Sequence, residues 1–220
     1  MIRTAIGYLR GIHHGALSQR ELARRIGKPD PVILEIGAHY GTDTLEFLET
    51  FPGAQIYCFE PDPDVATRWR ETVKDPRAKL FELAISAQDG ETTFCRSQLA
   101  TGSEGGDASG SIRKPTGVIE RFPEIKFNAE ITVPTRTLDS WCAEAGIDHV
   151  DFIWADVQGA EADLIAGGRA TLDKTRYFYT EYGKHVLYEG QLDCDQIAEL
   201  LPNHRVVKRW RHDVLFEAVG

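Results

Sequence analysis

Cysteine is scarce in this sequence, and the few cysteines form no recognisable pattern. The four of them are Cys58, Cys95, Cys142 and Cys194, far apart and without a C-x-x-C pair. This spacing excludes a zinc-finger type of metal site and the disulfide framework of a small secreted domain. Separate cysteines of this kind are typical of a reducing compartment, so we expect a cytoplasmic protein.

Positive charge and long apolar runs are also in short supply. Lys and Arg number 25 against 34 Asp and Glu, which gives a net charge of −9. This balance argues against general binding to nucleic acid or to an anionic membrane surface. The N-terminus has no long apolar core, so we expect neither a signal peptide nor a membrane span.

The sequence does contain an apolar run that ends in an acid and two glycines. Residues 32–41 read Val-Ile-Leu-Glu-Ile-Gly-Ala-His-Tyr-Gly, and a helical pattern follows over residues 42–51. A buried strand, a glycine turn and a helix N-terminus form a cradle for nucleotide-type ligands. We expect the Glu35 carboxylate inside this cradle, where it would suit a cationic ligand. The same pattern also occurs in α/β proteins that bind nothing at the turn.

A second apolar strand, residues 55–60, also ends in an acid. Glu60 follows Gly41 by roughly 20 residues, the separation at which an acid accepts hydrogen bonds from a ribose diol. His39 stands where a dinucleotide-binding G-x-G-x-x-G turn would have its second glycine. The sequence therefore supports a ribose site and does not support a pyrophosphate site.

Strands alternate with helices along the rest of the chain, which predicts an α/β doubly wound sheet with an antiparallel C-terminal hairpin. Further strands are expected at residues 79–85, 132–136, 150–156, 177–182, 205–210 and 214–218. Ligands bind beyond the carboxyl ends of the strands in such sheets. Four acids follow predicted strand ends and are expected to converge there: Glu35, Glu60, Asp156 and Glu181.

Three other segments carry predictions about organisation. Residues 1–30 contain apolar residues at helical spacing and are expected to form a helical cap on the single domain of residues 31–220. The Asp89-Gly90 pair predicts a hairpin turn. Residues 97–117 are rich in Gly and Ser, so they are either disordered or a mobile loop at the active site.

Several of these motifs together resemble the FkbM-like methyltransferases, over roughly residues 30–218. The resemblance rests on Glu35–Gly41, Phe59–Pro61, Ala84–Ser86, Asp89–Gly90, Gly110–Ile112, Arg136–Asp139 and Asp156–Glu161. It implies the seven-stranded, Rossmann-like methyltransferase fold and S-adenosylmethionine as the cofactor. Trp154 is a departure, since the family often has lysine there; it either packs in the core or faces the pocket and alters acceptor choice.

The resemblance also implies roles for individual residues. Glu35, Gly37 and Gly41 would surround the methionine part of the cofactor, Glu60 would bind its ribose, and Ala84 and Ile85 would flank its adenine. The complete implied cofactor set is Glu35, Gly37, Ala38, His39, Gly41, Glu60, Ala84, Ile85, Ser111 and Asp156.

Family members commonly methylate hydroxyl groups of sugars, glycans or secondary metabolites. Removing the proton of such a hydroxyl requires a base, and the candidates here are Asp156, Glu181 and His185. Asp156 with Glu161 or Glu181 could hold a divalent ion or none, and no metal site is predicted. Two alternatives stay open, namely an NAD-dependent oxidoreductase and a methyltransferase-like domain that binds without turnover. The sequence predicts a small-molecule or glycan acceptor and makes no prediction of oligomeric state.

Overall fold

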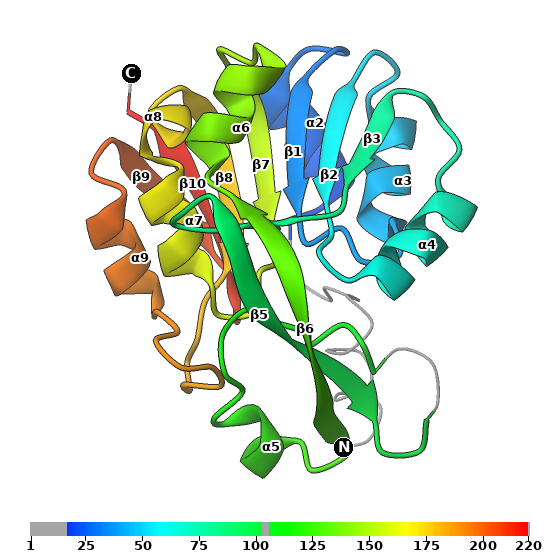
Figure 1. The fold of residues 1–220 in the computed structure, drawn as a ribbon. Helices are drawn as coiled ribbons and strands as arrows, with labels where there is room; N and C mark the ends of the chain where they lie inside the picture. The colour runs from blue at the N-terminus through cyan, green and yellow to red at the C-terminus, as the bar shows by residue number, and fades with distance from the viewer. Residues whose placement is uncertain (1–16, 103–105, 220) are drawn as a thin grey trace.

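The computed structural model describes residues 17–102 and 106–219 and is built around a seven-stranded sheet. The strand order is β3-β2-β1-β7-β8-β10-β9 (Figure 1). All neighbouring strands are parallel except β10, which is antiparallel to both β8 and β9. This arrangement confirms the predicted doubly wound sheet and its antiparallel C-terminal hairpin.

The main sheet has short strands, connected by helices up to the hairpin. Its strands are β1 (Val32–Ile36), β2 (Gln55–Phe59), β3 (Ala78–Phe81), β7 (Val150–Ala155), β8 (Thr175–Glu181), β9 (His204–Arg209) and β10 (Asp213–Ala218). The helices are α2 (Gln19–Ile26), α3 (Thr42–Thr50), α4 (Pro63–Thr72), α5 (Val118–Arg121), α6 (Leu138–Ala145), α7 (Glu161–Gly167), α8 (Arg169–Leu172) and α9 (Cys194–Leu200).

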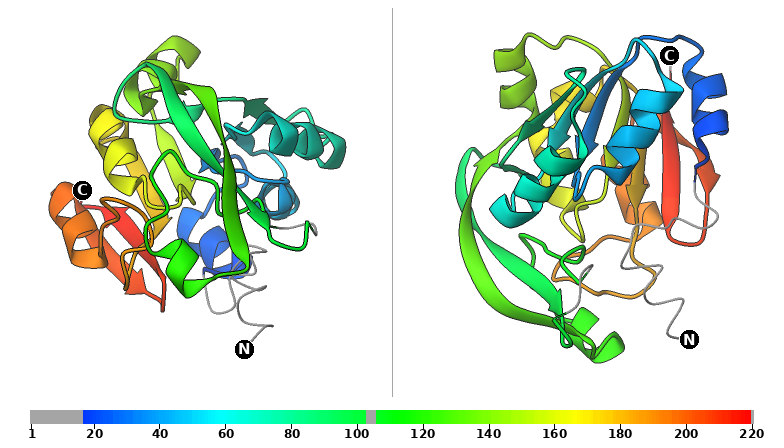
Figure 2. Two further views of the ribbon diagram at one scale, coloured as in Figure 1. Left: turned by 60° about the horizontal axis from the view of Figure 1, so that its bottom comes forward. Right: turned by 90° about the vertical axis from the view of Figure 1, so that its right-hand side faces the viewer.

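Helices cover both faces of the sheet, because successive residues of a buried strand point to opposite sides. Ile33 of β1 belongs to a core shared with α2, α3 and α4. Its neighbour Leu34 belongs to a second core shared with α6, α7, α8 and α9. Figure 2 shows the two helical layers from the side. The apolar run therefore predicted a strand that is buried on both faces.

A second sheet of three strands forms a long arm beside the main sheet (Figure 1). It consists of β4 (Ala84–Ile85), β5 (Gly90–Leu99) and β6 (Ile125–Arg136), in the order β4-β6-β5. Three sequence predictions are corrected here. The expected strand 79–85 is divided between β3 and β4, and the expected strand 132–136 is the end of the much longer β6. The prediction of a hairpin at Asp89-Gly90 is wrong, because β4 and β5 both pair with β6 and not with each other.

The Gly/Ser-rich segment 97–117 is only partly a loop. Its first three residues belong to β5, and Ser111 pairs with Cys95 in an isolated bridge.

The expected cap over residues 1–30 lies largely outside the described residues, which begin at Leu17. Its described helix, α2, buries Leu22 and Ile26 against the core. No described helix combines the length and apolar character needed to span a bilayer.

Trp154 packs in the core and does not face the cleft described below. Its side chain is 4% exposed, and its ring stacks on Tyr179 with 4.3 Å between centroids. It also makes an edge contact with Phe47 of α3. Of the two interpretations of this departure from the family, the one with Trp154 in the pocket is wrong. All four cysteines are buried free thiols.

Candidate active site

A cleft of about 1280 Å³, its open mouth included, lies beyond the carboxyl ends of β1, β2 and β7. The arm contributes Phe94 and Ile125, and the segment before α9 contributes Leu187 and Tyr188. The polar lining is mostly acidic or neutral, and none of the described lining residues is a lysine or an arginine. The lining therefore disfavours a pyrophosphate and suits a ligand with cationic and hydroxyl groups.

The floor of the cleft requires glycine at position 37. The Asp156 amide donates to the Ile36 carbonyl oxygen at 2.8 Å, which holds the ends of β1 and β7 together. A Cβ atom on Gly37 would lie 1.9 Å from the Asp156 carbonyl oxygen, and the φ angle of Gly37 is +90°. The backbone can form this floor only without a side chain there.

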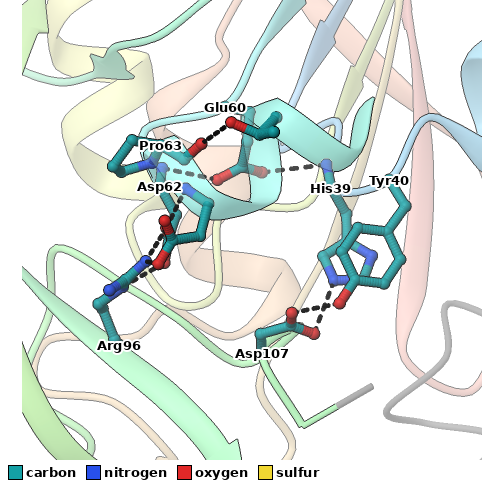
Figure 3. Close-up of polar contacts among 9 residues, drawn as sticks. His39, Tyr40, Glu60, Asp62, Pro63, Arg96 and Asp107 are labelled. Carbon is teal, nitrogen blue, oxygen red and sulfur yellow. Dashed lines mark hydrogen bonds and ion pairs between the residues drawn. The ribbon is translucent and has the colours of Figure 1, made fainter. Parts of the chain in front are cut away.

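Glu60 is fixed at the end of β2 by two backbone amides (Figure 3). The His39 amide donates to its Oε2 atom at 3.0 Å, and the Asp62 amide donates to its Oε1 atom at 2.9 Å. Burial raises the pKa of Glu60 to about 7 against the opposing effect of these hydrogen bonds. Each carboxylate oxygen keeps a further lone pair, so the side chain can accept hydrogen bonds from a diol.

A polar cluster connects the glycine turn to the loop after β5 (Figure 3). Asp107 accepts a hydrogen bond from the Tyr40 hydroxyl, and its Oδ1 atom lies 3.1 Å from His39 Nε2. The Arg68 guanidinium donates to the Tyr40 hydroxyl at 2.7 Å. Sequence reasoning missed Asp107, Tyr40 and Arg68. An acid within a Gly/Ser-rich loop was the available signal for Asp107.

Asp156 is held by a chain of hydrogen bonds that ends at a buried tyrosine. The Gln158 side-chain amide donates to Asp156 Oδ1 at 2.5 Å, and the Tyr188 hydroxyl donates to Gln158 Oε1 at 3.0 Å. Gln158 has a φ angle of +48°, a backbone conformation that non-glycine residues rarely adopt. Ser111 donates to the Gln158 carbonyl oxygen at 2.7 Å and so supports the same turn. Gln158 and Tyr188 were not among the predicted catalytic or cofactor-binding residues.

Further acids lie behind Asp156. Burial raises the pKa of Glu181 well above its ordinary value, and the charges of Asp156, Asp213 and Glu161 add to this effect. Burial likewise raises the pKa of Glu161 to about 7. Carboxyl groups of this kind can take up a proton near neutral pH. No group of three or more metal-ligating side chains suited to a metal ion occurs in the part of the chain that the structure describes.

The predicted site residues divide into two sets. Those that line the cleft are Gly37, Ala38, His39, Glu60, Ala84, Ile85, Ser111 and Asp156. Those that do not line it are Glu35, Gly41, Glu181 and His185. Gly41 packs under the turn against Trp69 and Val73, and His185 is exposed to solvent.

The prediction that the Glu35 carboxylate lies inside the cradle is wrong. Glu35 is 1% exposed and lies beneath the turn, where its Oε2 atom accepts hydrogen bonds from the Thr44 hydroxyl and the Cys58 thiol. Burial raises its pKa to about 8. The glutamate points to the α3 side of the sheet because of its place in the alternation of β1, which the apolar pattern of the strand did not reveal.

Glu35 should make the protein less stable as the pH rises. An unfolded glutamate ionises near pH 4.5, whereas folded Glu35 keeps its proton up to about pH 8. The folded state therefore binds more protons in this window, and its stability falls by up to roughly 1.4 kcal/mol per pH unit for one group. Thermal unfolding of Glu35→Gln should show a weaker decline between pH 5 and pH 8. Parallel pH profiles for variant and parent would contradict this role.

Comparisons with known proteins converge on one family. The model of the "Methyltransferase FkbM domain" matches residues 35–208. The 2-O-methyltransferase NoeI of Sinorhizobium fredii is 46% identical over 196 residues, which cover 89% of this chain and 81% of NoeI. The AMB antimetabolite synthetase AmbE of Pseudomonas aeruginosa is 28% identical over 215 residues, which cover 86% of this chain but only 10% of AmbE.

A solved structure extends the comparison to the fold. Methyltransferase FkbM from Methylobacillus flagellatus KT superposes on this chain with a TM-score of 0.52 and 13% sequence identity. The superposition covers 86% of this chain and 44% of that one. At this level of identity the likeness concerns the fold alone.

Proposed function

The chain belongs to the family of FkbM methyltransferases, and from this premise we propose that it transfers a methyl group from S-adenosylmethionine to a hydroxyl group of a sugar or glycan. The observation that carries the proposal is the acid-lined cleft at the carboxyl ends of β1, β2 and β7. The likeness to a protein named as a 2-O-methyltransferase supports oxygen as the methyl acceptor.

The residues of the cleft fit this cofactor. The floor that Gly37 forms with Asp156 would hold the methionine part, and the carboxylate oxygens of Glu60 would accept hydrogen bonds from the ribose hydroxyls. Ala84 and Ile85, which line the cleft, would form an apolar border for the adenine. S-adenosylmethionine supplies an electrophilic methyl group on a sulfonium, and the acidic lining favours that positive charge.

The chain's own residues then have to orient the acceptor and remove its proton. We propose that Asp156 accepts the proton of the acceptor hydroxyl, because its carboxylate lies in the cleft and is held in place by Gln158. Glu181 lies behind it and can share the proton, since burial and the neighbouring acids raise its pKa well above the ordinary value. Tyr188, 2% exposed, closes the wall behind Gln158 and helps keep water from the reacting atoms.

Glu60→Ala should weaken the binding of S-adenosylhomocysteine by about 1–3 kcal/mol, the scale for losing a charged hydrogen-bond partner. The parent protein should also bind this ligand more tightly as the pH rises from 6 to 8. Its Glu60 has a pKa of about 7, and only the carboxylate accepts from both ribose hydroxyls. Isothermal titration calorimetry at pH 6, 7 and 8 measures both effects.

Glu60→Gln serves as the matched control, because it keeps the size of the side chain and removes the titration. Its affinity should be lower than that of the parent at pH 8 and should change little with pH. Unchanged affinity in Glu60→Ala would remove the ribose role. Tighter binding of NAD than of S-adenosylhomocysteine would instead support the oxidoreductase alternative.

A further inference from the structure

A group of basic side chains lies on three segments, two of which also contribute residues to the lining of the cleft. We call it the basic rim; it consists of Arg121, Lys184, His185, Arg211 and His212. All except His212, which is half-buried, are exposed to solvent. The same segments also carry carboxylates, which are exposed at Glu120, Glu124 and Glu189 and less exposed at Glu181 and Asp213. In a chain with a net charge of −9, such a concentration of cations is unexpected.

Hydrogen bonds bring the three segments of the basic rim together. The amides of Gly117 and Val118, at the start of α5, both donate to the Leu187 carbonyl oxygen, at 2.8 and 3.2 Å. The Tyr182 amide donates to the His212 carbonyl oxygen at 2.8 Å, and its hydroxyl donates to the Trp210 carbonyl oxygen at the same distance. The rim is therefore a product of the fold, although its members are far apart in the sequence.

The side chains of the rim interact electrostatically. The pKa of His212 is lowered, by burial first and then by the charges of Arg211, Lys184, Arg121 and His185. Arg121, Lys184 and Arg211 form no ion pair with any carboxylate in residues 17–102 and 106–219. Exposed cations that lie close to one another favour the binding of an anion.

The rim adjoins residues that line the cleft. Val118, on α5, and Phe122, directly after Arg121, both line the cleft, as do Leu187 and Tyr188, which follow His185 closely. The floor of the cleft is acidic at Glu60, Asp107 and Asp156. The floor of the cleft therefore carries acidic groups, whereas the segments that form its wall at Val118 and Leu187 also carry members of the basic rim.

We infer that the acceptor carries an anionic substituent, a sulfate, phosphate or carboxylate, which the basic rim binds while the hydroxyl to be methylated faces Asp156. This inference rests on the proposed function. The acidic floor suits the cationic methyl donor and repels an acceptor anion, so the anion is held at the mouth. Charged contacts at both ends then fix the orientation of the acceptor.

Histidine signals provide a test that does not depend on turnover. Sodium sulfate, phosphate or acetate is titrated into the full chain at constant ionic strength, and the imidazole resonances are followed by NMR. At least one anion should shift the His185 and His212 signals and raise the pKa of His212. The double variant Lys184→Glu/Arg211→Glu should lose both effects. Lys174→Glu reverses an exposed lysine at the amino end of β8, the opposite end of the strand from Glu181, and should keep them.

The outcomes separate this inference from the proposed function. Absence of any shift at His185 and His212 with all three anions would overturn the anionic acceptor, even if methyl transfer to a neutral sugar is observed. Shifts that depend on Lys184 and Arg211, without methyl transfer to any hydroxyl, would support the anion site and refute the methyltransferase activity. Where transfer occurs, the double variant should raise KM for an anionic acceptor by about tenfold, with kcat nearly unchanged.

Discussion

Asp156→Asn is expected to lower turnover by about 10²-fold or more, the usual scale for a positioned acid–base group. Asparagine keeps the size of the side chain and can still accept the hydrogen bond from Gln158, but it cannot take a proton from the acceptor hydroxyl. The fold should survive, because Asp156 is only half-buried and lies at the end of β7. Steady-state methyl transfer measures the loss of turnover, and thermal unfolding checks that the variant keeps its fold.

Two further variants rank the candidate bases in the same assay. Glu181→Gln should cause a smaller loss than Asp156→Asn, because Glu181 lies behind the cleft and acts through its neighbour. His185→Ala should cause the smallest loss, since the imidazole is exposed and does not line the cleft. Near-normal turnover of Asp156→Asn would move the catalytic role to the segment after β8. Recovery on addition of magnesium or manganese would indicate that Asp156 holds a metal.

Gly37→Ala should destabilise the protein by about 3 kcal/mol or more and abolish measurable cofactor binding. The added methyl group would lie 1.9 Å from the Asp156 carbonyl oxygen, so β1 and β7 would have to separate beneath the cleft. The φ angle of +90° adds conformational strain for any side chain. Denaturant unfolding and calorimetry with S-adenosylhomocysteine measure the two losses.

Gly146→Ala is the matched control for backbone strain. Gly146 also has a positive φ angle, +69°, at the end of α6, but a Cβ atom there has no neighbour within 4 Å. Its substitution should cost only about 1 kcal/mol and leave cofactor binding unchanged. Equal effects of the two substitutions would show that conformation alone, and not the contact with β7, makes glycine necessary at position 37.

Much of the site was predictable because its signals are local. An acid directly after a buried strand must lie at the carboxyl edge of a parallel sheet, which placed Glu60 and Asp156 correctly in the cleft. The glycine turn that begins at position 37 was predictable as well, because it also comes directly after a buried strand. The resemblance to the FkbM family added Ser111, which the structure also places in the lining.

The missed features depend on contacts between distant segments. β5 and β6 pair across a connection that contains α5, and no local pattern indicates that Gly90 lies opposite Thr135. Asp107 and Tyr188 reach the site only because the arm and the segment before α9 fold over the sheet. Glu35 was misplaced because a glutamate within an apolar strand resembles a ligand-binding acid, although this one is buried against Thr44 and Cys58. The mobility expected for residues 97–117 stays a prediction.

The most direct test of the account is to follow the methyl group itself. S-adenosylmethionine with a ¹³C-labelled methyl group is incubated with the full chain and a panel of neutral and anionic sugars, and the products are analysed by mass spectrometry and NMR. We predict that the label appears on a sugar oxygen and that S-adenosylhomocysteine accumulates in equal amount. Label on nitrogen or carbon, or no transfer to any sugar by protein that binds S-adenosylhomocysteine, would contradict the proposed function.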